Sequence, residues 1–320
     1  MTTKKIVILG TGGTIAGQAA SSDDNLGYTA AQLGVNQLVA AVPGLSQLDG
    51  LLCEQVAQID SKDMTFKVWT ELASRVQHHL VQDDVQGVVI THGTDTLEET
   101  AYFLQAVLHP LKPVVLTCAM RPATATAPDG PQNILDAVSV ARLPGAQGVV
   151  MVCAGVVHSA ENVQKVHTMQ LDAFSSGDAG AIGFIQGNTF KSLQNWPVLP
   201  VNKAQEAPEN IAKLKRVVAW PKVDIVMNYA GVSGDMVDAL VGLGAQGLVV
   251  AGTGNGTVHE VLQAALLKAQ ARGVQVVRAT RCVAGPVLAR FDDCFPTSNG
   301  LSPVKARIAM MLRLIEIGAC

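Results

Sequence analysis

Two short stretches of the chain combine hydroxyl groups with the small and acidic residues found in many reactive turns. Residues 10–17 read Gly-Thr-Gly-Gly-Thr-Ile-Ala-Gly, and residues 91–96 read Thr-His-Gly-Thr-Asp-Thr. A threonine hydroxyl is a weak nucleophile until a base removes its proton, so threonine chemistry here needs a basic partner. Taken alone, each stretch is also typical of a turn or helix start whose threonines only bind the backbone.

A dinucleotide site is the first alternative for the glycine-rich stretch. Gly10 and Gly12 fit the start of the G-x-G-x-x-G pattern, but its third glycine position is occupied by Ile15. No acidic residue closes a second strand about 20 residues further on, where such a site binds the ribose. The spacing therefore argues against a nucleotide cofactor and leaves a hydroxyl on a strand-end loop.

The elements that would position these loops follow from hydrophobic periodicity. Short, mostly β-branched apolar runs predict buried strands at residues 6–9, 85–91, 113–119, 148–154, 224–229, 247–252 and 275–280. Between two of them, apolar residues spaced by three, four and seven predict one helix face, made of Phe66, Trp69, Leu72, Ala73, Val76 and Leu80. Strands that alternate with helices predict an α/β fold with a largely parallel sheet.

Both reactive stretches follow a predicted strand directly, the first after residue 9 and the second within and after residues 85–91. Ligands of parallel α/β sheets bind at the carboxyl ends of the strands, so the two stretches are expected to face a common crevice. Thr96 and Glu99 are expected to cap the helix that follows the second stretch.

The length of 320 residues exceeds the usual single core of about 250–300 residues, which favours two domains. The alternation of predicted strands and helices is interrupted between residues 195 and 221, where four prolines (Pro197, Pro200, Pro208 and Pro221) lie among Lys and Glu. We interpret this segment as a linker between domains at residues 1–194 and 222–320. In the second domain, Thr257 with Glu260 and Ser302 with Pro303 predict two helix starts.

Composition narrows the function classes. Hydrophobic residues form 48% of the chain and charged residues 15%, which argues for an extensive core and against disorder. The net charge of −3, the absence of a basic block and the 4% aromatic content disfavour nucleic-acid partners. No apolar stretch approaches the about 18 residues of a membrane helix. The apolar run after Lys4 and Lys5 ends at Leu9, too short for a signal peptide, so a cytoplasmic location is expected.

Metal and thiol chemistry find little support in the sequence. The six cysteines form no C-x-x-C pair and are expected to be reduced and structural. The pairs His78 with His79 and His158 with His167 lack the compact spacing of zinc ligands, so no metal is expected. His92 is interpreted as a structural hydrogen-bonding residue.

The two reactive stretches together resemble the paired motifs of the bacterial-type L-asparaginases and glutaminase-asparaginases. They lie about 80 residues apart, and further matches occur at residues 60–64, 119–122, 129–133 and 254–256, so the resemblance spans nearly the whole chain. It implies a larger N-terminal domain with a mostly parallel sheet flanked by helices and a smaller C-terminal parallel α/β domain. It also implies hydrolysis of L-asparagine to L-aspartate and ammonia without a cofactor, by a homotetramer whose sites are shared between subunits.

The resemblance assigns catalytic roles residue by residue. Thr14 matches the nucleophile and Tyr28 lies on the mobile lid that follows it, at residues 17–28. Thr94, Asp95 and Lys165 match a second catalytic group, in which the lysine serves a proton relay. The match at Lys165 rests on its surroundings, residues 161–165, because an isolated lysine carries no such information.

The same comparison assigns the substrate contacts. Ser61 matches the group that binds the substrate α-carboxylate, and Asp95 the group that binds its ammonium. Backbone amides near Thr94 and Ala119 are expected to line the developing oxyanion. Asn255 is expected to reach the site of a neighbouring subunit.

Three features depart from the family pattern. Lys62 stands where many secreted members have Gln. This puts a cation at the position that recognises the charged groups of the substrate, and it is expected to affect selectivity for the substrate side chain. Arg290 stands at or beside the family's cross-subunit acidic residue, with Asp292 and Asp293 close by, so the ammonium site is expected to be built differently. The two cysteines that form a disulfide in several periplasmic relatives have no counterparts, which agrees with a cytoplasmic location.

Alternatives to an asparaginase remain open. A glutaminase-asparaginase of broad selectivity, which also accepts L-glutamine, shares every matched residue. An amidotransferase subunit that releases ammonia resembles the same family but carries an additional N-terminal domain, for which a first strand at Ile6 is expected to leave no room. A non-catalytic relative would lack a catalytic residue, and all five are present.

Overall fold

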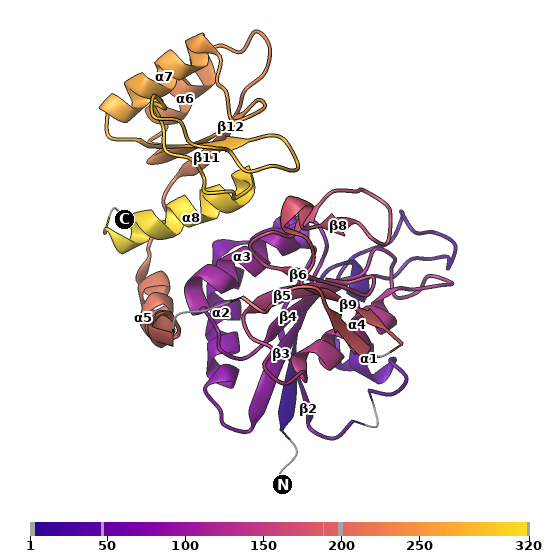
Figure 1. Ribbon diagram of the computed structural model, residues 1–320. Helices are drawn as coiled ribbons and strands as arrows, with labels where there is room; N and C mark the ends of the chain where they lie inside the picture. The colour runs from indigo at the N-terminus through magenta and orange to yellow at the C-terminus, as the bar shows by residue number, and fades with distance from the viewer. Residues whose placement is uncertain (1–3, 46–47, 188, 198–200, 319–320) are drawn as a thin grey trace. The chain divides into compact units, whose positions relative to one another are not determined.

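The computed structural model describes residues 4–45, 48–187, 189–197 and 201–318, which form two compact units, Met1–Ala212 and Lys213–Cys320 (Figure 1). Pro200 of the predicted linker and Cys320 lie outside the described residues. Within the described ranges, no helix has the length and hydropathy needed to cross a membrane.

The first unit is built on an eight-stranded sheet of order β10-β9-β6-β5-β4-β3-β1-β2. Five strands pair in parallel: β1 (Lys5–Gly12), β2 (Leu51–Ile59), β3 (Val85–Thr91), β4 (Val114–Thr117) and β5 (Val149–Cys153). The sheet then becomes antiparallel through β6 (Val156–Ser159), β9 (Gly183–Gln186) and β10 (Thr189–Ser192). The four strands predicted in this part of the chain are confirmed as β1, β3, β4 and β5.

Helices cover both faces of this sheet (Figure 1). Ile6 and Ile8 of β1 point to a core shared with α1 (Val35–Ala40) and α4 (Gly130–Ala141), as expected for alternate residues of a strand. The other face is covered by α2 (Phe66–Leu80) and α3 (Leu97–Leu108), which pack against each other and on β3 and β5. The predicted helical stripe is confirmed in α2, where Trp69, Leu72, Ala73 and Val76 are buried.

The second unit contains a three-stranded parallel sheet of order β11-β12-β13, with strands Val223–Met227, Gly247–Gly252 and Gln275–Thr280. It is flanked by α6 (Asp235–Gly242), α7 (Glu260–Ala271) and α8 (Pro303–Glu316). The three predicted strands are confirmed, and so is the α/β fold class with a larger, mostly parallel first sheet and a smaller parallel second one.

The segment interpreted as a linker contains a helix, α5 (Val201–Arg216), with Pro208 inside it. A proline removes one backbone donor and usually marks a helix boundary, which is why the prolines of this segment suggested irregular chain. The division into domains at residues 195–221 stays a prediction.

One predicted helix start is wrong and one is confirmed. Helix α7 begins at Glu260, and the ring of His259 accepts a hydrogen bond from Val261 N at 3.2 Å. Thr257 instead donates its hydroxyl to Thr253 O at 2.9 Å within a turn, so no capping box with Glu260 forms. Helix α8 does begin at Pro303 after Ser302, although the Ser302 hydroxyl makes no capping bond.

Candidate active site

Three loops meet at the carboxyl ends of the parallel strands, and glycines allow them to touch. A Cβ atom built on Gly13 would lie 2.3 Å from both Cα and N of Gly93, and one on Gly93 would lie 2.5 Å from Ser61 Oγ. Either side chain would collide with its neighbour, so these two glycines bring the loops after β1, β2 and β3 together. The two reactive stretches, which were predicted to face each other, are therefore in contact.

Thr14 and Tyr28 form one hydroxyl pair of the site. Thr14 lies in a single 3-10 turn after β1 and is only 7% exposed. Its Oγ1 lies 2.6 Å from the Tyr28 hydroxyl. The chain reaches this arrangement because Gln18 and Thr29 exchange two backbone hydrogen bonds, which fold residues 17–28 back over the turn.

Thr94, Asp95 and Lys165 form a second cluster. Lys165 donates from Nζ to Thr94 Oγ1 at 2.8 Å and to Asp95 Oδ1 at 2.7 Å. The Thr94 hydroxyl donates to the same carboxylate oxygen at 3.4 Å, so it lies between a cation and an anion. The side chain of Lys165 is 19% exposed and that of Asp95 is 52% exposed, which places the cluster at the surface of the unit.

Lys165 reaches the cluster from a small hairpin beyond the parallel sheet. It lies in β7 (Gln164–Lys165), which pairs antiparallel with β8 (Phe174–Ser175). The preceding Val163 is fully buried and anchors the strand. An apparently ordinary surface lysine is thereby aimed at the loop after β3.

Ser61 connects two of the loops. Its hydroxyl accepts the backbone N–H of Asp95 at 3.2 Å, and its carbonyl accepts the Thr96 hydroxyl at 2.7 Å. Thr96 was expected to cap α3, and it does occupy the N-cap position, but its side chain makes no capping bond. The hydroxyl instead holds Ser61 in the site, which corrects the capping prediction.

The ammonium group of Lys62 is paired with neighbouring carboxylates and does not contact the Thr94, Asp95 and Lys165 cluster. Its side chain is 61% exposed, and Nζ donates to Asp60 Oδ2 at 2.6 Å and to Asp63 Oδ2 at 3.1 Å. These two carboxylates raise the pKa of Lys62, so the side chain stays protonated. Its charge is locally balanced on the Ser61–Asp63 turn.

Asp129 fixes the loop after β4 and was given no role from sequence. Its carboxylate accepts the N–H of Met120 at 2.9 Å and of Arg121 at 3.0 Å, which sets the turn that follows Ala119. Ala119 itself is fully buried. A Cβ built on Gly130 would lie 3.0 Å from Ile15 and 3.5 Å from Ala119, so this loop lies beside the Thr14 turn.

Cys118, directly before Ala119, is not a nucleophile candidate. The neighbouring Cys153 thiol and complete burial raise the pKa of the Cys118 thiol well above its usual value. The thiol is therefore protonated at neutral pH, and the thiolate is the reactive form. This agrees with the structural role expected from sequence.

Two further threonines hold residues 17–28 in place and were missed from sequence. Thr124 accepts the Ala19 N–H at 2.9 Å, and Thr126 donates from its N–H to Ser22 O at 3.0 Å and from its hydroxyl to Asp23 Oδ1 at 3.2 Å. Alternating small residues at 123–127 carry no motif that would have indicated this contact. We call these bonds the lid latch.

Asn255 lies in the second unit, in the turn after β12. Its side-chain amide donates to Leu288 O at 3.1 Å and accepts Leu288 N–H at 2.7 Å. One amide hydrogen and one oxygen lone pair remain for another partner. The structure thus gives Asn255 a role inside its own chain and leaves its predicted contact with a neighbouring subunit as a prediction.

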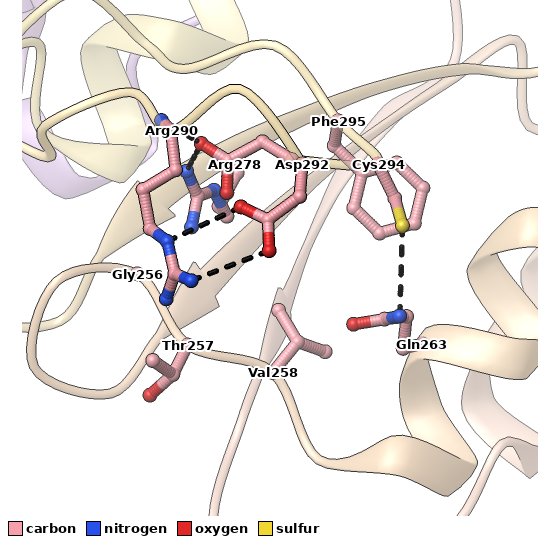
Figure 2. A pocket seen from close by; sticks show the side chains of 10 residues that line it. Gly256, Thr257, Val258, Gln263, Arg278, Arg290, Asp292, Cys294 and Phe295 are labelled. Carbon is pink, nitrogen blue, oxygen red and sulfur yellow. Dashed lines mark hydrogen bonds and ion pairs between the residues drawn. The ribbon is translucent and has the colours of Figure 1, made fainter.

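The carboxylates near Arg290 are engaged within the second unit, around a pocket of about 260 Å³ (Figure 2). Arg290 pairs with Asp292 at 3.2 Å, while Asp293 accepts Arg290 N–H at 2.7 Å and pairs with the buried Arg278. This pocket contains none of the matched catalytic residues. Both acidic side chains close to Arg290 are therefore already neutralised by arginine.

The chemistry available to the site is hydroxyl and proton chemistry. Two buried threonine hydroxyls and Asp95 lie on the loops that touch at Gly13 and Gly93. Tyr28 adds a phenol, and Lys165 adds an ammonium group from the β7–β8 hairpin. Among the described residues, no group of three or more His, Cys, Asp or Glu side chains is arranged to hold a metal ion. The five matched catalytic residues fall into these two clusters, and in the part of the chain that the structure describes no hydrogen bond joins Thr14 directly to Thr94.

Comparisons with known proteins agree with this architecture. The N-terminal asparaginase family model matches residues 5–197, and the glutaminase/asparaginase C-terminal domain model matches residues 222–316. L-asparaginase 2 of Bacillus subtilis (strain 168) is 38% identical over 97% of this chain and 82% of its own. Glutaminase-asparaginase of Pseudomonas fluorescens biotype A is 38% identical over 97% and 86%. A crystal structure of a probable cytoplasmic L-asparaginase from Campylobacter jejuni superimposes with a TM-score of 0.89, at 38% identity, over 97% of this chain and 95% of that one.

Proposed function

Because the chain belongs to the asparaginase family, we propose that it hydrolyses L-asparagine to L-aspartate and ammonia through a threonine nucleophile. The observation that carries the proposal is the cluster of Lys165, Thr94 and Asp95, with Nζ at 2.8 and 2.7 Å from the two oxygens. Amide hydrolysis by a hydroxyl nucleophile requires a group that removes the hydroxyl proton and a group that protonates the leaving nitrogen, and this cluster contains groups that transfer protons.

The reaction proceeds in two steps. Thr14 Oγ1 attacks the side-chain amide carbon, its proton passes through the hydroxyl and lysine groups to the leaving nitrogen, and ammonia departs from an acyl-threonine ester. Water then attacks the ester, which restores the Thr14 hydroxyl and releases aspartate. The oxyanion that forms in each step accepts backbone N–H groups near Thr94 and Ala119.

Substrate binding uses the remaining groups. Ser61 Oγ, held by Asp95 N–H at 3.2 Å, binds the substrate α-carboxylate. Lys165 and Thr94 both contact Asp95 Oδ1, so Oδ2 takes the substrate ammonium. Lys62 lies on the same turn as Ser61, but Asp60 and Asp63 already balance its charge, so we assign the carboxylate to Ser61.

A glutaminase-asparaginase of broad selectivity is the second candidate. The glutaminase-asparaginase of Pseudomonas fluorescens is as similar to this chain as the L-asparaginase 2 of Bacillus subtilis, at 38% identity. In the proposed mechanism the groups around Thr14 and Thr94 act on the side-chain amide, which L-asparagine and L-glutamine share. Selectivity between the two substrates therefore depends on the fit of the additional methylene of glutamine. Such a difference changes the specificity ratio by about 10–200-fold.

The purified protein is expected to release ammonia from L-asparagine without added metal or nucleotide. Every proposed participant is a side chain or a backbone amide, so activity should be unchanged after dialysis against EDTA. Ammonia and aspartate are measured in parallel, with L-glutamine as the comparison substrate. Activity that EDTA abolishes and zinc restores would contradict the mechanism, and no release from either amide would contradict the function.

We propose in addition that the active form is a homotetramer in the cytoplasm, with Asn255 entering the site of a neighbouring subunit. The fit to the C-terminal family model and the two unused hydrogen-bonding positions of the Asn255 amide support the shared site. The cytoplasmic location is supported by the similarity to a probable cytoplasmic L-asparaginase from Campylobacter jejuni, although a relative from Haemophilus influenzae is a probable periplasmic L-asparaginase.

Complementation between Thr14→Ala and Asn255→Ala chains tests the shared site. In random assembly half of the subunit pairs are mixed, and each mixed pair has one fully wild-type site, so co-expression should restore about a quarter of wild-type activity. If Asn255 acts within its own chain, no site is repaired. Activity no higher than the mean of the separate variants would therefore contradict the shared site.

A further inference from the structure

A buried hydrogen-bond chain runs from α2 to the loop that carries Thr94. Trp69 donates from Nε1 to Thr100 Oγ1 at 2.9 Å, and Thr100 Oγ1 lies 3.0 Å from His92 Nε2. The other ring nitrogen, His92 Nδ1, lies 2.7 Å from Gly93 O. Trp69 is 4% exposed, and His92 and Thr100 are fully buried, so water does not compete for these bonds.

The donor at every step of this chain is fixed by chemistry. An indole nitrogen only donates, so Thr100 Oγ1 accepts from Trp69 and directs its own hydrogen to His92 Nε2. A carbonyl oxygen only accepts, so the ring proton lies on Nδ1 and is donated to Gly93 O. Burial lowers the pKa of His92 to about 4, and the imidazole is therefore neutral at pH 7 with a single tautomer.

The carbonyl that His92 holds belongs to the peptide that ends in Thr94 N–H. Because a peptide unit is planar, fixing Gly93 O also fixes the direction of that N–H. Among the described residues, no acceptor is hydrogen-bonded to Thr94 N–H. The same glycine is packed between Gly13 and Ser61, so a rotated peptide would disturb the contact of all three loops.

We infer that His92 is a positioning residue for the reaction: its Nδ1–H holds Gly93 O and so aims Thr94 N–H at the developing oxyanion. The inference rests on the proposed function, because it needs an oxyanion at that place. It goes beyond that function in two ways. The rate of the chemical step depends on the tautomer of the buried His92, and Trp69 and Thr100 set this tautomer.

Two amide substitutions separate positioning from packing. In His92→Asn the amide nitrogen can occupy the place of Nδ1 and still donate to Gly93 O, whereas the larger part of the ring is lost. In His92→Gln the amide can reach the place of Nε2 near Thr100 and fills more of the cavity, but it offers Gly93 O no donor. If His92 only fills space, kcat should therefore be higher in His92→Gln than in His92→Asn. If His92 positions Gly93 O, kcat should be higher in His92→Asn.

The experiment measures kcat and KM for L-asparagine together with the melting temperature of the wild type and both variants. Removal of an oxyanion donor costs about 10²–10³ in kcat, and a donor that is misaimed rather than removed should cost less. We expect His92→Gln to lower kcat about tenfold with KM within about twofold, and His92→Asn to keep the higher kcat although it melts at the lower temperature.

A second readout does not depend on turnover. The chain has seven histidines, so the ¹⁵N resonances that disappear in His92→Gln identify the ring. We expect these resonances to show a neutral ring protonated on Nδ1 at pH 7. A ring protonated on Nε2, or a His92→Gln variant with kcat equal to or above that of His92→Asn, would overturn the inference alone. A wild-type protein that releases no ammonia would overturn the proposed function, and the inference with it.

Discussion

Replacement of Thr14 by alanine is expected to lower kcat for L-asparagine by several orders of magnitude while the fold is retained. The Thr14 hydroxyl is buried, and its one hydrogen-bond partner among the described residues is the Tyr28 hydroxyl at 2.6 Å, so its removal takes away the proposed attacking group and little packing. Thr94→Ala should cost a similar factor, because it breaks the contact of Lys165 at 2.8 Å. Steady-state kinetics and circular dichroism of both variants provide the measurement.

Thr11→Ala is the matched control for the proposed nucleophile. Thr11 lies near the end of β1, three residues before Thr14, and is also buried, but its hydroxyl donates to the backbone carbonyl of Thr91 at 2.9 Å. This variant should lose about 1 kcal/mol of stability and keep most of its turnover. The Thr14→Ala, Thr94→Ala double variant should cost far less than the product of the single effects, since groups that act as one unit are not additive. Near-wild-type turnover by either single variant would remove that threonine from the mechanism.

Gly13→Ala is expected to reduce activity at least about a hundredfold and to lower the melting temperature, because the new Cβ cannot be accommodated. Gly13 has a φ of 82°, and its Cβ would lie 2.3 Å from the backbone of Gly93, which has no flexible side chain to move away. The loops that carry Thr14 and Thr94 would then be forced apart. Misplacement by about 1 Å is enough for losses of this size.

Gly145→Ala is the control for a positive-φ glycine without a collision. Gly145 has a φ of 77°, but its Cβ would meet no atom within 4 Å. Gly13→Ala adds the collision and also more backbone strain, because Gly13, with a ψ of −172°, lies in a region that essentially only glycine occupies. Equal activity and melting temperature of the two variants would contradict the idea that contact between Gly13 and Gly93 assembles the site.

The buried part of the fold could be predicted because its strands are continuous apolar runs. Strand β2 was missed since it lies at the sheet edge, where Glu54, Gln55 and Gln58 interrupt the apolar pattern. Strands β6 to β10 were missed because they have two to four residues each, too few for any periodicity to emerge. Pro208 led to a predicted irregular segment where the structure has helix α5, since this helix contains a residue that usually ends one.

The site was predicted unevenly for a related reason. Thr14 and Thr94 follow buried strands, so the geometry of parallel sheets alone brought them to one edge. Lys165 lies on a two-residue strand in an irregular part of the chain, and only the family resemblance identified it. The lid latch and the role of Asp129 depend on contacts across about 100 and 10 residues with backbone atoms, which no side-chain motif records.

The direction of the parallel strands has a practical consequence for use of the protein. The loops that carry Thr14, Ser61, Thr94 and Ala119 leave the carboxyl ends of β1, β2, β3 and β4, whereas the turns that enter the parallel strands lie at the opposite end. Pro144 and Gly145, just before β5, are exposed at such a turn. A peptide tag or a tether to a solid support inserted there would leave the crevice facing away from the attachment, so an immobilised catalyst should keep open access to dissolved amides.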